Sequence, residues 1–329
     1  MTQVTSKKKD TALRRLLRTD EVSVFIPLLA IIVITTIFRP DFLSIANFSA
    51  MFTQIPFIAI VALGSSFTLM TGNVDISTGR VAGMAGILMS VLCVDYGWNV
   101  WPAILVAIVA CSLIGFYNGF LVVKMGVPDF VATMGTLYMV GGARYLFIKG
   151  YQLSLNTLEG FYMDEVFNAR YLGMPPHFWV MLVLFAIVFV VIKKSLWGRR
   201  LLACGDNREV AMLAGINVTK MRMTAYTLAA LFSAIGGILL TLDVGLGLPE
   251  TGDGWEFRAI AGCVVGGVSL SGGKGSPLGV LIGITLVFVA ENAIIFLGMP
   301  TTMRVAIQGA LMAAAVLFDI YRQSRKVPA

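Results

Sequence analysis

The sequence predicts an all-α protein, a bundle of about ten helices that cross a membrane, and three observations support this fold class. First, 57% of the 329 residues are hydrophobic and only 13% are charged, whereas about a quarter of the residues in soluble domains are charged. Second, apolar runs long enough to cross about 30 Å of hydrocarbon recur along the chain. Third, Lys and Arg are concentrated in alternate loops. A soluble enzyme, a disordered chain and a collagen-like chain are therefore excluded.

Ten apolar runs are the candidate spans. In chain order they are 22–38, 48–70, 81–94, 101–123, 130–148, 178–192, 224–242, 260–270, 278–297 and 305–320. The runs 81–94 and 260–270 are much shorter than the about 20 residues that a straight helical span needs. The prediction is therefore a bundle of eight to ten spans.

The basic residues predict which loops face the cytoplasm. If the N-terminus lies inside and the spans alternate, only six of the 25 Lys and Arg residues fall outside: Arg39, Arg144, Lys149, Arg170, Arg258 and Arg304. The other 19, with Arg80 among them, fall on the inner side, where the loops of membrane proteins are rich in basic residues. Both termini are therefore predicted to be cytoplasmic. The net charge of +7 then belongs to one membrane face, and no nucleic-acid partner is expected.

The chain divides into a membrane domain, residues 22–320, and two cytoplasmic tails, residues 1–21 and 321–329. No cleavable signal peptide is expected, because the first apolar run is too long and no small-residue cleavage site follows it. Two loops are long. The outer loop, 149–176, is either a cap over the helix ends or a docking surface for an extracytoplasmic protein. The inner loop, 193–222, lies on the cytoplasmic side.

The inner loop contains one short predicted helix, 207–214. Asp206 is its expected N-cap, with Glu209 three residues later as in a capping box. Gly215 is expected to end the helix in the left-handed conformation. A short helix at a membrane surface either transmits movement from a soluble motor to the bundle or packs only on its own bundle.

The side chains of this helix suit contact with a partner. Ala211 and Ala214 are small enough for another surface to approach closely, and Arg208 and Glu209 place charges at the rim. If the helix transmits movement, these residues are the expected points of contact.

Two Gly-rich polar segments interrupt the apolar runs, and each adjoins one of the two short runs. The first reads TGNVDISTGR over 71–80, and the second reads GGVSLSGGKG over 266–275. Transporters place binding sites where a helix breaks and its free backbone groups face a cavity. In that case Asn73, Asp75 and Ser77 lie along the solute pathway. Alternatively, each segment is a tight turn with close, Gly-mediated helix packing.

Glu291 and Asn292 form the polar pair that lies deepest within an apolar run, 278–297. An ionisable group at such a depth needs a partner or a polar environment. The pair therefore forms hydrogen bonds between helices or lines a polar pathway for a solute, or else the span is misplaced.

The sequence contains no motif for chemistry by this chain. The segment around Lys274 resembles a phosphate loop, but Val268 stands where the first Gly of that loop is required. The one histidine, His177, has no catalytic partner in sequence, and the four cysteines lack the spacing of a disulfide framework or a zinc site. The chain is therefore expected not to be an enzyme and to hold no cofactor, and it cannot power transport by itself.

Three blocks carry a family resemblance. The block TGNVDISTG at 71–79 is similar to a TGGIDLSVG block, and it is followed by GRRLLACGDNREVAMLAGINVTKMRMTAYTLAALFSAIGGILL at 198–240 and by EFRAIAGCVVGGVSLSGGKGSPLGVLIG at 256–283. In this order and spacing, they look like the permease subunits of bacterial ABC importers of the ribose, arabinose and galactose type. The resemblance extends from about residue 38 to residue 318.

The resemblance implies a permease that pairs with a second permease subunit, as a homodimer or a heterodimer, in the bacterial inner membrane. It implies a periplasmic sugar-binding protein that delivers a monosaccharide, and alternating access that ATP drives. It also implies that a cytoplasmic ABC ATPase, which binds ATP and Mg, docks on the helix of the inner loop through Asp206, Asn207, Arg208, Glu209, Ala211, Ala214 and Gly215.

The substrate stays open, because related permeases carry autoinducer-2, nucleosides or branched-chain amino acids. Three positions depart from the family pattern. Asn73 and Asp206 stand where the family often has Gly, and Glu291 stands where a small or neutral residue is usual. A transporter of a different class, coupled to an ion gradient, would use Asp75 and Glu291 as ion sites.

Overall fold

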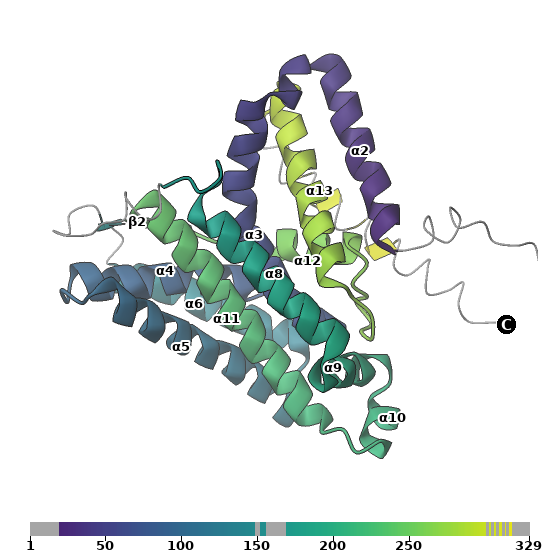
Figure 1. Cartoon of the computed structure of the whole chain (residues 1–329). Coiled ribbons are helices and arrows are strands. Elements are labelled where there is room, and N and C mark those ends of the chain that lie inside the picture. The colour runs from purple at the N-terminus through teal and green to yellow at the C-terminus, as the bar shows by residue number, and fades with distance from the viewer. Residues whose placement is uncertain are drawn as a thin grey trace, which may run out of the picture.

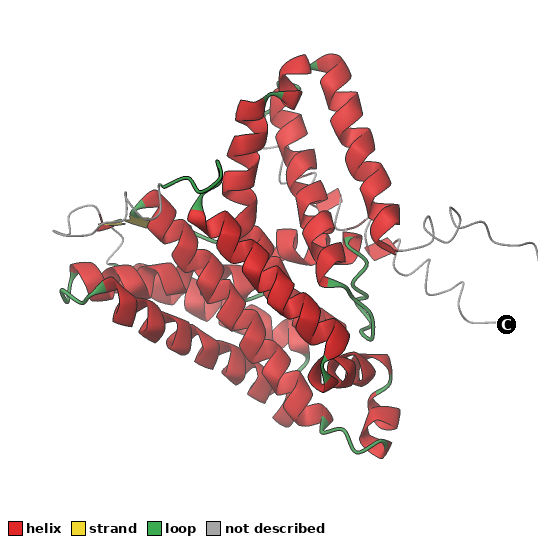
Figure 2. Cartoon of the chain, viewed as in Figure 1, coloured by secondary structure: helices red, strands yellow, loops and turns green. Residues whose placement is uncertain are grey.

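The structure is a computed structural model that describes residues 20–148, 152–155 and 169–300, with single positions between 303 and 317. The predicted tenth span, most of the predicted outer loop and nearly all of both predicted tails lie outside the described residues. The described part is predominantly helical, which confirms the all-α class (Figures 1 and 2).

The longer helices, in chain order, are α2 (Asp20–Phe38), α3 (Ile45–Met70), α4 (Thr78–Val94), α5 (Val100–Gly119), α6 (Asp129–Phe147), α8 (Pro176–Lys194), α9 (Leu196–Asp206), α10 (Arg208–Leu213), α11 (Val218–Val244), α12 (Trp255–Val265) and α13 (Pro277–Phe296). The short helix η1 (Pro40–Leu43) precedes α3, and one π-helical turn, η2 (Phe120–Lys124), extends α5. Two short strands, β1 (Leu153–Ser154) and β2 (Leu246–Gly247), pair in antiparallel fashion.

Five of the described helical segments are long and apolar enough to cross a membrane. They are Ile45–Met70, Val100–Lys124, Pro176–Lys194, Val218–Val244 and Pro277–Phe296. Two shorter apolar helices, Phe25–Phe38 and Thr78–Val94, coincide with predicted spans as well. The chain is therefore a multi-pass membrane protein.

Helix α11 lies at the centre of the bundle and packs against α3, α4 and α5. In Figure 1, α8 and α11 run diagonally between the group α2, α3 and α13 and the group α4, α5 and α6. The crossing of α11 and α4 depends on glycine: Gly237 lies against the backbone of Ala82, and Gly86 lies against Thr241. The absence of a side chain allows these two helix backbones to approach closely.

The two Gly-rich segments are breaks in the helical bundle. After α3 the chain turns, and it becomes helical again only at the start of α4. After α12 it is non-helical until Pro277. Left-handed backbone at Gly72, Gly272 and Gly273 explains the turns, since other residue types rarely adopt it. The run 81–94 was short for a span because the chain reaches α4 through a non-helical segment.

The helix predicted over 260–270 is displaced toward the N-terminus. Helix α12 begins at Trp255 and ends at Val265, and the next five residues of the predicted run are not helical. The apolar pattern continued through Val268 and Leu270, but Gly266 and Gly267 end the helix, the second of them in a left-handed conformation.

The two breaks contact each other at one end of the bundle. The backbone N–H of Gly273 donates to the carbonyl of Met70 over 3.0 Å. A Cβ atom added to Gly72 would lie 2.9 Å from the carbonyl oxygen of Ser271. Beyond the turns, Val74, Ile76 and Leu270 belong to one hydrophobic cluster. Segments that are far apart in sequence therefore form one joint non-helical core.

One assignment of the charge partition is wrong. Arg80 was placed inside and Arg144 outside, but both guanidinium groups contact the same carboxylate oxygen of Asp253, at 2.6 Å and 2.7 Å. The two arginines therefore lie at one depth. The partition failed here because it treated residues 71–80 as a surface turn, whereas this segment runs back along α6 before α4 begins.

Candidate functional site

Helix α10 is the short helix that the sequence predicted in the inner loop, but a different residue caps it. The side-chain oxygen of Asn207 accepts the N–H groups of Glu209 and Val210, at 3.0 Å and 3.1 Å. Asp206 is instead the last residue of α9. The preceding Gly205 packs against Met70 at the end of α3 and against Gly273 in the second break, which holds the chain in α9 up to Asp206. The left-handed Gly215, with φ of +76°, is as predicted.

The faces of α10 differ in what they contact. Ala211, only 2% exposed, packs with Cys204, Val218 and Met221 of the neighbouring helices. The small side chain of Ala211 therefore allows α10 to pack closely on α9 and α11 of the same chain. Ala214 and Glu209 are exposed. The largest exposed apolar surface on α10 comes from side chains that the sequence analysis did not select, Val210, Met212 and Leu213.

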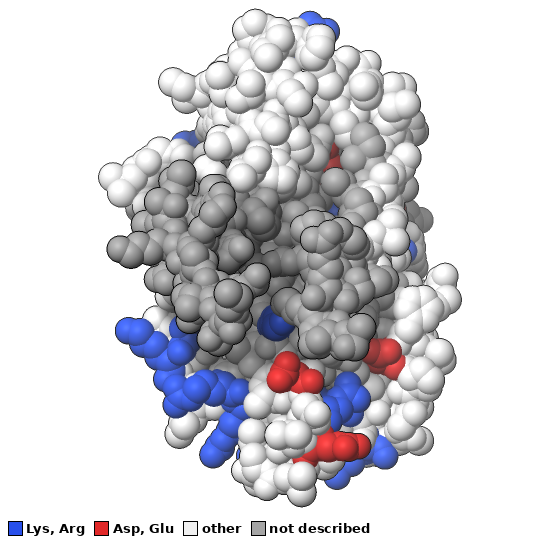
Figure 3. All heavy atoms as spheres, turned by 90° about the vertical axis from the view of Figure 1, so that its right-hand side faces the viewer, with Lys and Arg blue, Asp and Glu red and all other residues white. Residues whose placement is uncertain are grey.

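Basic side chains surround this apolar surface. Figure 3 shows Lys and Arg gathered at the end of the molecule that carries α9 and α10, with a few acidic side chains among them. The exposed basic residues of this part of the chain are Lys193, Lys194, Arg199, Arg200, Arg208 and Lys220. Burial raises the pKa of the Cys204 thiol beneath α10, although the neighbouring Arg208 and Arg222 oppose this change. The thiol therefore stays protonated and unreactive.

Arginine side chains connect α10 and α11 to the first break. Arg208 donates to the carbonyl of Gly72 over 3.2 Å, and the Nε atom of Arg222 donates to the side-chain oxygen of Asn73 over 2.9 Å. The Asn73 amide group then donates to the carboxylate of Asp129, at the start of α6, over 3.3 Å. A movement of α10 would therefore act directly on the non-helical core.

The polar side chains of the first break are buried and satisfied within the chain. Asp75 accepts the backbone N–H and the hydroxyl of Ser77, at 2.9 Å and 2.6 Å. Asn118 of α5 donates to the Ser77 hydroxyl over 2.9 Å and accepts the hydroxyl of Thr136 of α6. Such a network replaces the backbone hydrogen bonds that the break removes. It holds the extended segment between α5 and α6.

Glu291 and Asn292 both contact other helices. Glu291 forms an ion pair of 3.2 Å with Arg258 of α12, and Asn292 donates to Asn47 of α3 over 2.8 Å. The same two residues line a polar cavity of about 230 Å³, whose walls are Gln54, Arg258, Phe288, Glu291, Asn292 and Ile295. The pair therefore forms contacts between helices and also lines a polar cavity.

The sequence analysis did not find the cluster of Arg80, Arg144, Asp253 and Glu256. Arg144 is fully buried and also donates to the carbonyl of Thr251 over 2.6 Å. The intramembrane arginines were a usable signal, because each needs a partner. Which carboxylate supplies it was not evident, because Asp253 lies in a loop 109 residues further along the chain.

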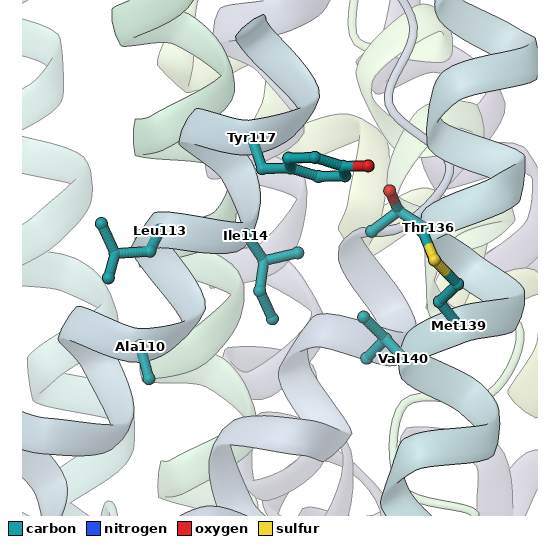
Figure 4. A pocket seen from close by; sticks show the side chains of 7 residues that line it. All are labelled: Ala110, Leu113, Ile114, Tyr117, Thr136, Met139 and Val140. Carbon is teal, nitrogen blue, oxygen red and sulfur yellow. The ribbon is translucent and has the colours of Figure 1, made fainter. Parts of the chain in front are cut away.

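A second cavity, of about 310 Å³, lies between α5 and α6 and is almost entirely apolar. Figure 4 shows its lining residues, Ala110, Leu113, Ile114, Tyr117, Thr136, Met139 and Val140. The hydroxyl of Thr136 is already bonded to Asn118, so it offers little to a polar solute. This cavity is therefore unsuited to binding a hydrophilic molecule.

These features define the class of the protein. Broken helices with a buried polar core are typical of membrane transporters, and the described residues contain no group of three His, Cys, Asp or Glu side chains able to hold a metal ion. The chain belongs to the family of permease components of the branched-chain amino acid transport system, whose family model matches residues 47–316. It is therefore a transport subunit and not an enzyme.

Characterised relatives are similar over nearly the whole chain. A ribose import permease protein of Bacillus subtilis (strain 168) is 32% identical, over 90% of this chain and 91% of its own length. An L-arabinose ABC transporter permease protein of Azospirillum brasilense is 29% identical, over 94% and 89%. An autoinducer 2 import system permease protein of Shigella flexneri is 27% identical, over 91% and 86%. No solved structure matches the chain.

Proposed function

We propose that this chain is the membrane-spanning permease subunit of an ATP-binding cassette importer that translocates a monosaccharide delivered by a periplasmic binding protein. The observation that carries the proposal is the alignment with a ribose import permease over about nine-tenths of both chains. The relatives for L-arabinose and autoinducer 2 support a small hydroxylated solute. ATP and Mg bind to a partner ATPase, since this chain has no phosphate loop.

The proposed topology has about ten spans in the bacterial inner membrane, with both termini in the cytoplasm. The positive-inside rule supports it, because the inner loop places its basic residues around α9 and α10. Arg80 is removed from the inner group, since it lies within the bundle beside Arg144. The basic excess of the inner side survives this correction.

The proposed partners are an ABC ATPase, a second permease subunit and the binding protein, which the outer loop 149–176 would meet. The ATPase docks on α10, with the exposed apolar residues of that helix at the centre of the contact and Asp206, Asn207, Arg208, Glu209, Ala214 and Gly215 around them. Ala211 supports the helix from beneath. Closure of the ATPase would move α10, and Arg208 would pass that movement to the first break.

The predicted pathway residues have two proposed roles. Glu291 and Asn292 line a polar cavity and would contact solute directly. Asn73, Asp75 and Ser77 are engaged within the chain, and they would shape the pathway by holding the extended segment. Alternating access would then proceed by rigid movement of the bundle around the breaks, with no covalent chemistry in this chain.

Reconstituted transport tests the proposal. The permease, its ATPase and its binding protein are reconstituted in liposomes, and uptake of labelled ribose, arabinose, autoinducer-2, a nucleoside and leucine is compared. We expect uptake of a monosaccharide that requires both ATP and the binding protein. Uptake driven by an ion gradient without the ATPase would contradict the proposal and favour an ion-coupled transporter.

The docking role of α10 gives a specific prediction. Leu213 is 88% exposed, so Leu213→Glu leaves the fold unchanged but places a charge in the apolar contact with the ATPase. We expect the copurified ATPase to fall at least about tenfold, in line with the loss of a central interface residue. The matched control is Ile45→Glu, because Ile45 is 89% exposed. Ile45 lies at the start of α3, whereas the end of that helix, Met70, contacts the breaks near α10. Equal ATPase recovery with both variants would show that α10 is not the docking site.

A further inference from the structure

The cluster around Asp253 lies between the two ends of the helical bundle. Asp129, at the first turn of α6, accepts the N–H of Val74 close to the breaks. Arg144 lies 15 residues further along α6, a rise of about 22 Å. On α4, Val94 at the end of the helix lies 14 residues after Arg80, a rise of about 21 Å from the cluster. Helix α6 ends at Phe147, three residues after Arg144, so we infer that these charges lie inside the hydrocarbon layer of about 30 Å but toward its outer side.

The arginines hold Asp253 in one orientation. Both guanidinium groups contact its Oδ1 atom, at 2.6 Å and 2.7 Å. Among the described residues, no hydrogen bond or ion pair engages its Oδ2 atom. Glu256 lies beside them, 3% exposed, against Gly79. Asp253 and the guanidinium groups place a carboxylate acceptor next to N–H donors, which suits the hydroxyl groups of a neutral ligand.

This cluster is only partly covered by protein. The side chain of Arg80 is 25% exposed and that of Asp253 is 35% exposed. Charged side chains at this depth almost always face the bundle interior or a water-filled cavity, because contact with hydrocarbon is costly. The surface beside them is therefore not a lipid surface.

Helix α6 adds aromatic surface next to the charges. Gly141 lies beside Arg80, and a Cβ atom there would be 3.7 Å from the Cδ atom of the arginine. Tyr138 and Tyr145, three residues before and four residues after Gly141, lie on the same side of the helix and are exposed. Tyrosine combines a flat apolar ring with a polar hydroxyl.

We propose that this face of α4 and α6 lines the aqueous solute pathway, and that Asp253 Oδ2 and Arg80 bind neighbouring hydroxyl groups of a neutral, polyhydroxylated solute. One hydroxyl donates to the carboxylate, and the next accepts from the guanidinium. Arg144 is a positioning residue that fixes the carboxylate, and the tyrosine rings cover the apolar side of the solute. This inference rests on the proposed function and adds a solute site separate from Glu291 and Asn292.

Cysteine accessibility tests the inference without disturbing the ion pairs. Gly141→Cys places a thiol beside Arg80, in ordinary contact only. It is treated, in the transporting complex, with methanethiosulfonate ethylsulfonate, which is charged and reacts with thiolates in water. The control is Val109→Cys, on the exposed apolar face of α5. The native cysteines are all buried.

We expect Gly141→Cys to be modified at least about tenfold faster than Val109→Cys, to lose uptake on modification, and to be protected by excess transported sugar. If Gly141→Cys does not transport, Gly142→Cys replaces it, because no atom lies within 4 Å of a Cβ at Gly142. Equal slow modification of both positions, or modification that leaves uptake unchanged, would overturn the inference. In either case wild-type uptake shows that the proposed function stands, whereas absence of ATP-driven uptake by the wild type refutes the proposed function itself.

Discussion

Replacement of Gly237 by leucine is expected to prevent the bundle from folding. A Cβ atom at this position would collide with the carbonyl oxygen, carbonyl carbon and Cα atom of Ala82. These are backbone atoms, so no change of rotamer relieves the collision. Helix α4 cannot retreat, because it packs on α5 and α6 and its Gly86 is held against Thr241 of α11. The loss should exceed the about 1–3 kcal/mol of ordinary overpacking.

The measurement is the yield of monodisperse protein in detergent and its thermal unfolding midpoint. The matched control is Gly135→Leu on α6, because no atom lies within 4 Å of a Cβ at Gly135. We expect the control to behave as the wild type and Gly237→Leu to aggregate or to be degraded. Similar yields and midpoints for the two variants would show that α4 and α11 do not cross as described.

Replacement of Arg144 by methionine is expected to have the second largest effect on stability. The side chain is fully buried and donates to Asp253 and to the carbonyl of Thr251. Methionine has a similar length but no donor, so the carbonyl of Thr251 loses this hydrogen bond and Asp253 loses one of its two counter-charges. A hydrogen bond to a charged group contributes about 1.5–3 kcal/mol, and Arg80 still pairs with Asp253.

The same loop makes the effect measurable. Thr251 and Asp253 lie between β2 and α12, so we expect a lower midpoint of thermal unfolding when Arg144 no longer holds this loop. The control is Arg80→Met, because Arg80 is partly exposed and Arg144 still holds Asp253 when Arg80 is removed. Arg144→Met should therefore be the less stable of the two variants. The reverse order would contradict the assignment of Arg144 as the structural anchor.

The prediction of helices was accurate where apolar runs were long and uninterrupted. The runs that became α3, α6, α8 and α13 have ends within three residues of those predicted. Burial in lipid demands apolar side chains and paired backbone groups over the whole span, so composition alone reveals such a segment. The end of α10 was also correct, because Gly215 supplies the left-handed residue that ends the helix.

Predictions that depended on neighbours elsewhere in the chain were less accurate. The cap of α10 moved from Asp206 to Asn207, since the packing of Gly205 against Met70 and Gly273 extends α9. The contact surface expected from Ala211 is internal, while Leu213 is exposed. The local sequence is compatible with a cap at Asp206 or at Asn207, and with either face of α10 being buried. Contacts with segments that are distant in sequence determine which cap and which face the chain adopts.

The sequence by itself determined that this is a helical membrane protein, that it is interrupted twice by Gly-rich segments, and to which family it belongs. These properties follow from local residue chemistry: hydrophobic length, the backbone freedom of glycine and the order of motifs. Only the tertiary structure decided that the two breaks touch, that Arg208 reaches the first of them, and that Arg80 and Arg144 meet on Asp253. Such pairings join residues far apart in the chain, and helix packing brings them together.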